Sequence, residues 1–264
     1  MAFARVNGVV IHYDLRGPAE KPAVVFSNSL GTDFRIWDAV AERLERDFRL
    51  VLYDKRGHGL SEATPQPYAM TDHVGDLAGL LDYLDIPKVA VVGLSVGGMI
   101  AQGLAAMRPD LVSALVLCDT AHKIGDEAFW NDRIDKTNGP GIVAMADAIM
   151  QRWFTPAYRS PDNPDFVGYV AMLTRTNTDG YAGTCAALRD ADLTESTRAL
   201  KVPTLCIVGD QDGSTPPDLV RSTADLIDGA RFEIVEGAGH LPCIEQPEKT
   251  ARLIGDFLSR SVAA

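Results

Sequence analysis

Cysteine is scarce in this 264-residue sequence, and no two cysteines stand at the spacing of a C-x-x-C motif. The four thiols are Cys118, Cys185, Cys206 and Cys243. Cys118 and Cys206 lie inside apolar runs typical of strands. Because a chain of this length can bury a sizeable core without cross-links, we expect four buried thiols in a reducing compartment and a cytoplasmic protein.

Long hydrophobic runs are missing as well. No uninterrupted apolar run approaches the roughly 18 residues of a membrane-spanning helix. Residues 1–8 also lack the basic segment, followed by an apolar one, that marks a secretion signal. We therefore expect neither secretion nor a membrane partner.

Positive charge is in short supply. The chain has 25 Lys and Arg against 36 Asp and Glu, a net charge of −11, which argues against nucleic acid as a partner because phosphate binding needs a basic surface. An anionic substrate would need a locally placed cation. No two histidines stand at a metal-ligand spacing such as H-E-x-x-H, so we expect no metal.

Strand-like and helix-like segments alternate along most of the chain. Short apolar runs occupy residues 9–15, 23–28, 50–54, 89–92, 114–119, 204–209 and 232–236, and longer amphipathic segments separate them. One such helix is predicted to begin at a Thr71 cap and the last near Pro247. The alternation predicts an α/β fold, with a mostly parallel sheet covered by helices on both faces.

The alternation stops between residues 121 and 197. This segment is rich in aromatic residues, is broken by Gly and Pro, and has helical periodicity. We predict that residues 1–120 and 198–264 form the sheet core and that residues 121–197 form a helical cap inserted into it.

A serine stands at the predicted turn between a strand and a helix. Residues 93–97 read GLSVG and follow the apolar run 89–92, the pattern of a nucleophile elbow with Ser95 at its apex. The same residues imitate a dinucleotide-binding fingerprint. That interpretation fails because a serine replaces the glycine that lets a pyrophosphate approach the backbone.

A serine nucleophile needs a base and an acid to orient it. His240 follows the last predicted strand in a glycine-rich loop, and Asp212 or Asp210 follows the strand before it, with Asp119 as a third candidate acid. The other histidines, which come earlier in the chain, are predicted to be structural (His12, His73) or candidates for substrate contact (His58, His122).

Such a serine also needs two N–H groups to hold the oxyanion. One comes from the residue after the nucleophile and the other from the loop after an early strand. We assign these roles to Val96 and Leu30.

Several motifs together resemble the α/β-hydrolase fold, from about residue 5 to 260. They are GLSVGG, YDKRGHGLS, GDQDGSTPP and GAGHLP, and the third of them matches Asp212 to the family's acid. The loop NSLGTD at residues 28–33 departs from the common H-G-x form. This loop, with DTA at 119–121 and WNDRI at 130–134, is similar to 3-oxoadipate enol-lactonases of the β-ketoadipate pathway of aromatic catabolism.

The resemblance implies a substrate and its contacts. It implies a cofactor-free serine hydrolase that opens an anionic enol-lactone to 3-oxoadipate. Together with the net charge of −11, it suggests that Arg133 binds the substrate carboxylate from the cap and that Trp130 forms an apolar wall. The alternatives are another capped hydrolase (carboxylesterase, C–C bond hydrolase or perhydrolase) and a hydrolase-fold receptor with slow turnover. The sequence does not predict an oligomeric state.

Overall fold

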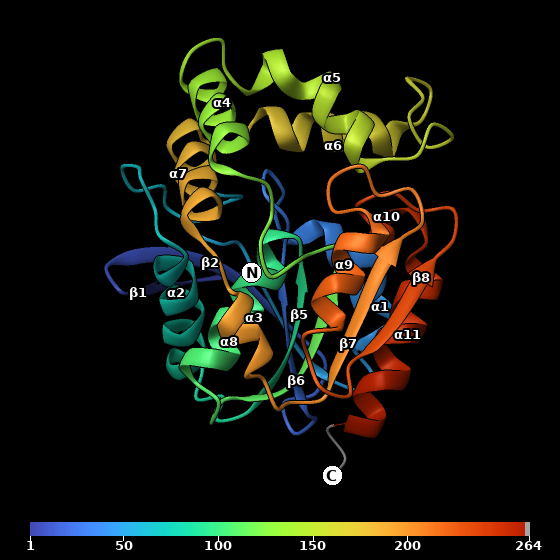
Figure 1. The fold of residues 1–264 in the computed structure, drawn as a ribbon. Helices are drawn as coiled ribbons and strands as arrows, with labels where there is room; N and C mark the ends of the chain where they lie inside the picture. Colours follow the sequence, from blue (N-terminus) through green and yellow to red (C-terminus); the bar gives the residue numbers. More distant parts are fainter. Residues whose placement is uncertain (262–264) are drawn as a thin grey trace.

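A single eight-stranded sheet forms the centre of the described part of the chain, residues 1–261 of the computed structural model (Figure 1). Its order is β1-β2-β4-β3-β5-β6-β7-β8, and only β2 runs antiparallel to its neighbours β1 and β4. The strands are β1 (Ala2–Val6), β2 (Val9–Arg16), β3 (Ala23–Ser27), β4 (Arg49–Tyr53), β5 (Val89–Leu94), β6 (Val112–Cys118), β7 (Thr204–Gly209) and β8 (Arg231–Val235).

Helices cover both faces of this sheet. They are η1 (Phe34–Trp37), α1 (Asp38–Leu44), α2 (Met70–Tyr83), α3 (Val96–Met107), α4 (Glu127–Asn138), α5 (Ile142–Trp153), α6 (Pro164–Thr174), α7 (Thr178–Asp190), α8 (Thr194–Arg198), α9 (Pro217–Ala224), α10 (Pro242–Glu245) and α11 (Pro247–Ser261). Helices α2, α3 and α8 pack together on one face, and α1 packs with α11 on the other. The predicted α/β class is confirmed.

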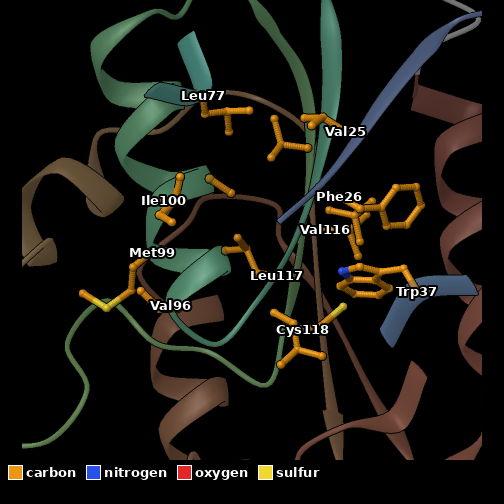
Figure 2. Close-up of a cluster of buried hydrophobic side chains, with 14 of the residues drawn as sticks. Val25, Phe26, Trp37, Leu77, Val96, Met99, Ile100, Val116, Leu117 and Cys118 are labelled. Atoms are coloured by element: carbon orange, nitrogen blue, oxygen red, sulfur yellow. The ribbon is translucent and has the colours of Figure 1, made fainter. Parts of the chain in front are cut away.

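Burial on both faces of the sheet explains why the central strands are continuously apolar in sequence. All six residues of β5 are buried, because helices cover this strand on both sides. Figure 2 shows Ile100 of α3 near Leu117, while Phe26 and Trp37 lie near Val116. The rings of Phe26 and Trp37 are 5.1 Å apart. Alternate residues of one strand therefore fill two separate hydrophobic layers.

Two details of the sequence prediction need correction. Strand β1 was not predicted, and it extends the sheet by pairing with β2 at the edge. Thr71 does not cap α2, because the helix already begins at Met70, and Asp72 instead accepts a hydrogen bond from the Ala69 N–H at 2.8 Å. The expected C-terminal helix does begin at Pro247, and all four cysteines are buried, unpaired thiols.

The chain between β6 and β7 is helical. Helices α4, α5 and α6 lie beyond the carboxyl ends of the strands, at the top of Figure 1. The last helix of this segment, α8, instead contacts α3 on the sheet. We propose that α4 to α7 are the functional cap and that α8 belongs to the core. Within residues 1–261, no helix has the length and apolar character needed to cross a bilayer.

Candidate active site

The candidate catalytic residues gather at one edge of the sheet. Ser95 follows β5, Asp119 follows β6, Asp212 lies in the loop after β7, and His240 lies in the loop after β8. These four strands are parallel neighbours, so their carboxyl ends meet at the same edge. Ligands of open α/β sheets bind at this edge.

Ser95 occupies a strained turn. Its φ of 58° and ψ of −121° are unusual for a residue with a side chain. The turn is possible because its neighbours are small: a Cβ at Gly97 would lie 2.1 Å from the Ser27 carbonyl oxygen, and one at Gly93 would lie 2.3 Å from the Gly97 carbonyl oxygen. The Thr120 hydroxyl donates to the Ser95 carbonyl at 2.6 Å and fixes the turn from the next strand end.

Asp212 and His240 form a buried pair. His240 Nδ1 lies 2.9 Å from Asp212 Oδ2 and 3.1 Å from Oδ1. The carboxylate also accepts from the N–H groups of Ser214 at 2.7 Å and Thr215 at 3.0 Å, and from the Thr215 hydroxyl at 2.7 Å. Asp210 is exposed and accepts from the Ala238 N–H at 3.2 Å instead. Of the two aspartates in this loop, Asp212 therefore contacts the histidine.

Opposing effects set the charge of Asp212. Burial by itself would raise its pKa, but His240, Thr215 and Ser214 together lower the pKa below the usual range of an aspartate. Asp212 is therefore ionised and holds the Nδ1 nitrogen of His240 in its protonated form. This tautomer leaves Nε2 free of a proton.

A second buried carboxyl group adjoins this pair. Asp119, also at a positive φ of 46°, is fully buried, and its Oδ1 accepts from the Gly209 N–H at 2.9 Å. Burial and the neighbouring Asp212 raise the pKa of Asp119 well above the ordinary range. Asp119 is therefore neutral and Asp212 carries the negative charge, as expected for two carboxyl groups that share one site.

Asp119, Asp212 and His240 have ligand-type atoms that all lie within 4.8 Å of one another, a separation that a metal ion could bridge. However, Nδ1 of His240 already binds the Asp212 carboxylate. The donor set fits a hydrogen-bonded acid–histidine pair better than a metal centre.

The loop after β3 lies beside the serine turn. A Cβ at Gly97 would contact both the Ser27 and Asn28 carbonyl oxygens, so the start of α3 and this loop touch. Val96 is the first residue of α3 and has no intrahelical acceptor for its N–H. Leu30, in the loop, is buried. Both residues are thus placed at the same edge of the sheet.

Buried side chains brace this loop from within. The Asn28 side chain donates to the Thr32 carbonyl. The Ser29 carbonyl accepts from the Thr32 hydroxyl at 2.9 Å and from the Lys55 ammonium at 2.5 Å. Sequence analysis missed Lys55, although it lies in the quoted motif YDKRGHGLS, because a lysine in a loop normally reaches solvent.

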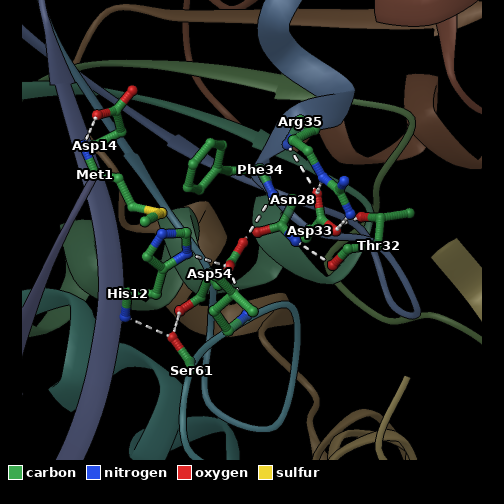
Figure 3. Close-up of polar contacts among 11 residues, drawn as sticks. Met1, His12, Asp14, Asn28, Thr32, Asp33, Phe34, Arg35, Asp54 and Ser61 are labelled. Carbon is green, nitrogen blue, oxygen red and sulfur yellow. Dashed lines mark hydrogen bonds and ion pairs between the residues drawn. The ribbon is translucent and has the colours of Figure 1, made fainter. Parts of the chain in front are cut away.

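The other histidines have structural contacts. His12 is buried on β2 and its Nδ1 lies 2.7 Å from Asp54 Oδ2 (Figure 3). His73, on α2, is fully buried and lies 3.3 Å from the Thr184 hydroxyl. Burial keeps the pKa of His73 at about 3, so it is neutral.

The two histidines suggested for substrate contact are also held by the protein. His58 is buried, with its Nδ1 3.2 Å from the Arg56 carbonyl oxygen. His122 bonds to the Thr223 hydroxyl of α9 through both its backbone N–H and its ring Nδ1. These contacts orient both side chains, and substrate contact by either residue stays a prediction.

Arg133 extends from α4 toward the loop after β3, which contains Leu30. Its Nη1 donates to the Tyr181 hydroxyl at 2.8 Å, and its guanidinium carbon lies 5.3 Å from the centre of the Phe129 ring. The Tyr181 ring in turn abuts Gly31, where a Cβ would lie 3.0 Å from Tyr181 Cε2. Arg133 is thus one side chain away from the loop that contains Leu30.

Trp130 lies inside the packing of the cap. It is buried, and its indole N–H donates to the Ile124 carbonyl at 2.6 Å. Its ring meets Phe129 edge to face at 4.9 Å. Trp130 therefore supports Phe129, on which Arg133 stacks, and its role as an apolar wall stays a prediction.

Sequence analysis also missed Arg152, the second cation of this region. Its guanidinium carbon lies 5.3 Å from the centre of the same Phe129 ring, and its carbonyl accepts from the Gly213 N–H beside Asp212. Nothing in the spacing of α4 and α5 indicated that the two arginines share an aromatic partner, since residues 133 and 152 meet only through the packing of the cap.

Comparisons with known proteins agree with this geometry. The family model for the alpha/beta hydrolase fold matches residues 22–247. The chain is 33% identical to 3-oxoadipate enol-lactonase 2 of Acinetobacter baylyi, over 91% of this chain and 90% of that one. The crystal structure of the enol-lactonase from Burkholderia xenovorans superposes with a TM-score of 0.95 at 37% identity, covering 98% of this chain and all of that one.

A thermophilic esterase from Thermogutta terrifontis is also similar, with a TM-score of 0.92 at 25% identity over 98% of each chain. The resemblance to enol-lactonases inferred from short motifs is thus confirmed over nearly the whole chain. The chain belongs to the α/β-hydrolase fold family and is a hydrolase of ester bonds.

Proposed function

We propose that the protein hydrolyses 3-oxoadipate enol-lactone to 3-oxoadipate through an acyl-enzyme. The observation that carries this proposal is the buried Asp212–His240 pair, held at the sheet edge where Ser95 follows β5. The similarity to enol-lactonases gives the substrate.

In the first half of the reaction, His240 Nε2 accepts the Ser95 proton while Ser95 Oγ attacks the lactone carbonyl carbon. The N–H groups of Leu30 and Val96 stabilise the negative oxygen of the tetrahedral intermediate. The ring C–O bond then breaks and expels an enol oxygen, which is a better leaving group than an alkoxide. His240 gives this oxygen its proton, and the enol relaxes to the ketone.

In the second half, water replaces the serine. His240 removes a proton from the water, the resulting hydroxide attacks the acyl carbon, and Ser95 leaves with the proton returned from His240. Asp212 keeps the imidazole in one tautomer throughout and stabilises its positive form. No step requires a cofactor.

The cap supplies recognition of the substrate's acetate side chain. We propose that Arg133, held by Tyr181 and Phe129, binds this carboxylate, because a guanidinium can grip a carboxylate with two parallel hydrogen bonds. Trp130 supports the stacking partner of Arg133. Arg152 shares that partner from the other cap helix.

A panel of substrates tests the proposal. We expect turnover of 3-oxoadipate enol-lactone with a higher kcat/KM than that of a neutral lactone of the same ring size or of a linear aryl ester. The second candidate is a carboxylesterase, suggested by the similarity to the Thermogutta terrifontis esterase. Preference for linear esters over every lactone would favour that candidate, and a single turnover without recycling would indicate a receptor.

A further inference from the structure

A buried lysine lies behind the oxyanion loop. Lys55 follows β4, and only 1% of its surface is exposed. Placing an ammonium group in a protein interior is costly unless it is paired with a charge. Within residues 1–261, however, no carboxylate oxygen lies within salt-bridge distance of Lys55 Nζ. Its hydrogen bond goes to the neutral Ser29 carbonyl oxygen, at 2.5 Å.

The nearby acids have other partners. Asp54 binds His12 and accepts from the N–H groups of Phe34 and Leu60. Asp33 forms a bidentate pair with Arg35, with contacts of 2.9 and 2.6 Å. The positive charge of Lys55 is therefore directed at the Ser29 carbonyl.

The carbonyl that accepts the Lys55 hydrogen bond shares a peptide group with the Leu30 N–H. The carbonyl of Ser29 and the N–H of Leu30 belong to the same peptide group, which is planar, so its C=O and N–H point in opposite directions. A cation that fixes and polarises the carbonyl must also fix the direction of the Leu30 N–H and make it a stronger donor. The Thr32 hydroxyl donates to the same carbonyl at 2.9 Å and restricts the peptide from another side.

We propose that Lys55 is a positioning residue for the oxyanion hole, acting through the Ser29–Leu30 peptide. Lys55 touches no reacting atom in this scheme. It holds the Leu30 N–H toward the site where the oxyanion forms, and its charge is felt strongly because the surroundings are buried. This inference rests on the oxyanion role of Leu30 in the proposed function.

The charged neighbours of Lys55 give the proposal a pH signature. Burial lowers the pKa of Lys55 to about 7, against the opposing effects of Asp54 and Asp33. Two histidines also lie nearby. Burial and the Lys55 charge lower the pKa of His58 well below its ordinary value, and the same two effects bring that of His73 to about 3. These two histidines are therefore neutral near pH 7, where Lys55 changes charge.

The test is Lys55→Met, which keeps a linear side chain but removes the charge. Removing an oxyanion-hole donor typically costs about 10²- to 10³-fold in kcat; loss of its support should cost less, about 10- to 30-fold in kcat with KM within about threefold. Affinity for a boronic acid, whose tetrahedral adduct carries an oxygen in the oxyanion hole, should fall by a similar factor. Affinity for the reaction product should not change.

The pH profile of kcat separates this role from simple loop support. The wild-type enzyme should lose activity above about pH 7, down to a lower plateau, because a neutral amine is a weaker donor than an ammonium group. The kcat of Lys55→Met should already be near that plateau at neutral pH and should show no step on the alkaline side. A second variant, Thr32→Val, removes the other side-chain donor to the Ser29 carbonyl; it should lower kcat by a smaller factor and keep the alkaline step.

Folding is checked by thermal unfolding and by titrating reactive serine with a fluorophosphonate. Unchanged kcat in a folded Lys55→Met variant, or a rise in KM with kcat unchanged, would overturn the proposal. All measurements use both the enol-lactone and p-nitrophenyl acetate. A wild-type enzyme active only on the ester would refute the proposed substrate and still test Lys55. Activity retained by Ser95→Ala would refute the serine mechanism itself.

Discussion

Two buried histidine–aspartate pairs with nearly the same geometry lie within residues 1–261. The distance from histidine Nδ1 to aspartate Oδ2 is 2.9 Å for His240 and Asp212 and 2.7 Å for His12 and Asp54. All four side chains are at most 5% exposed. The second pair even lines a cavity of about 890 Å³ between β2 and α6. Neither contact distance nor burial therefore distinguishes the pair proposed to be catalytic from the other one.

The surroundings of the two pairs differ. His240 lies in a loop at the carboxyl edge of the sheet, beside the strand ends that carry Ser95 and Asp212. His12 lies within β2, and the centre of its ring is 5.0 Å from that of Phe3 and 5.1 Å from that of Phe34. Figure 3 shows His12 with Phe34 and Asp54.

The serine near the second pair is also committed elsewhere. The Ser61 hydroxyl donates to the Asp54 carbonyl and accepts from the His12 N–H, so it bonds to backbone and not to the imidazole. In this structure, the two pairs therefore differ in the position of the nearby serine and not in their own geometry.

The strongest test of this contrast is removal of the nucleophile and the base. Ser95→Ala and His240→Ala should each lower kcat by about 10⁴-fold or more, since the residues of a triad act as a unit. His12→Phe, the matched change in the second pair, should leave kcat within about threefold, because it alters packing and not chemistry. Steady-state kinetics on the enol-lactone provide the measurement. A large loss for His12→Phe would show that the second pair takes part in catalysis.

The two aspartates of the loop after β7 should also differ in their effect on kcat. Asp212→Asn should lower kcat by about 10⁴-fold, because the histidine would adopt the wrong tautomer. Asp210→Asn should have a mild effect, since Asp210 is exposed and its carboxylate accepts from the Ala238 N–H and not from His240. If Asp210→Asn were the more damaging of the two, the assignment of the acid would be wrong.

Arg133 should matter for one class of substrate. Arg133→Ala should lower kcat/KM for the acetate-bearing lactone by about 30-fold or more, because loss of a partly desolvated charge partner costs about 2 kcal/mol or more. Hydrolysis of a neutral ester should change little. Lys136→Ala removes the same charge from the solvent side of α4, where Lys136 pairs with Asp132, and serves as the control.

Equal losses on both substrates after Arg133→Ala would indicate that the cap has collapsed, and no loss on either would refute carboxylate binding by Arg133.

Acid should inactivate the enzyme through its histidine. On the acidic side, kcat/KM should fall about tenfold per pH unit, because only a neutral imidazole can accept the serine proton. Asp212 does not cause this fall. Its pKa is below the usual range, so it is still ionised there, and the stability that it contributes is lost only at lower pH. A rate independent of pH between 5 and 8 would contradict the role of His240.

Asp54, the acid of the pair with His12, should matter much less for turnover than Asp212. Asp54→Asn places an amide where His12, Phe34 and Leu60 present donors. It should lower the free energy of unfolding by about 1–3 kcal/mol, the cost of leaving buried donors unpaired. It should lower kcat by no more than the roughly 10- to 30-fold expected for Lys55→Met, because the charge of Asp54 opposes the lowered pKa of Lys55. Denaturant unfolding measures the first quantity. A kcat loss as large as that of Asp212→Asn would remove the distinction between the two pairs.

The sequence by itself determined the α/β class and the positions of Ser95, Asp212 and His240 at strand ends, because period and turn chemistry are local properties. Residues 93–97 predict a strained turn without any knowledge of the sheet, since small residues must flank it. The choice between Asp210 and Asp212 was open from local chemistry alone. Only the motif resemblance indicated Asp212.

Tertiary structure decided which side chains meet. It placed Lys55 against the Ser29 carbonyl, Arg133 and Arg152 over one phenylalanine ring, and neutral Asp119 beside charged Asp212. It also excluded Asp210 from the pair with His240. These contacts join segments that are far apart in the chain, and burial sets their charges. Local sequence patterns contain neither the distances nor the burial, so the packed structure was needed to identify these contacts.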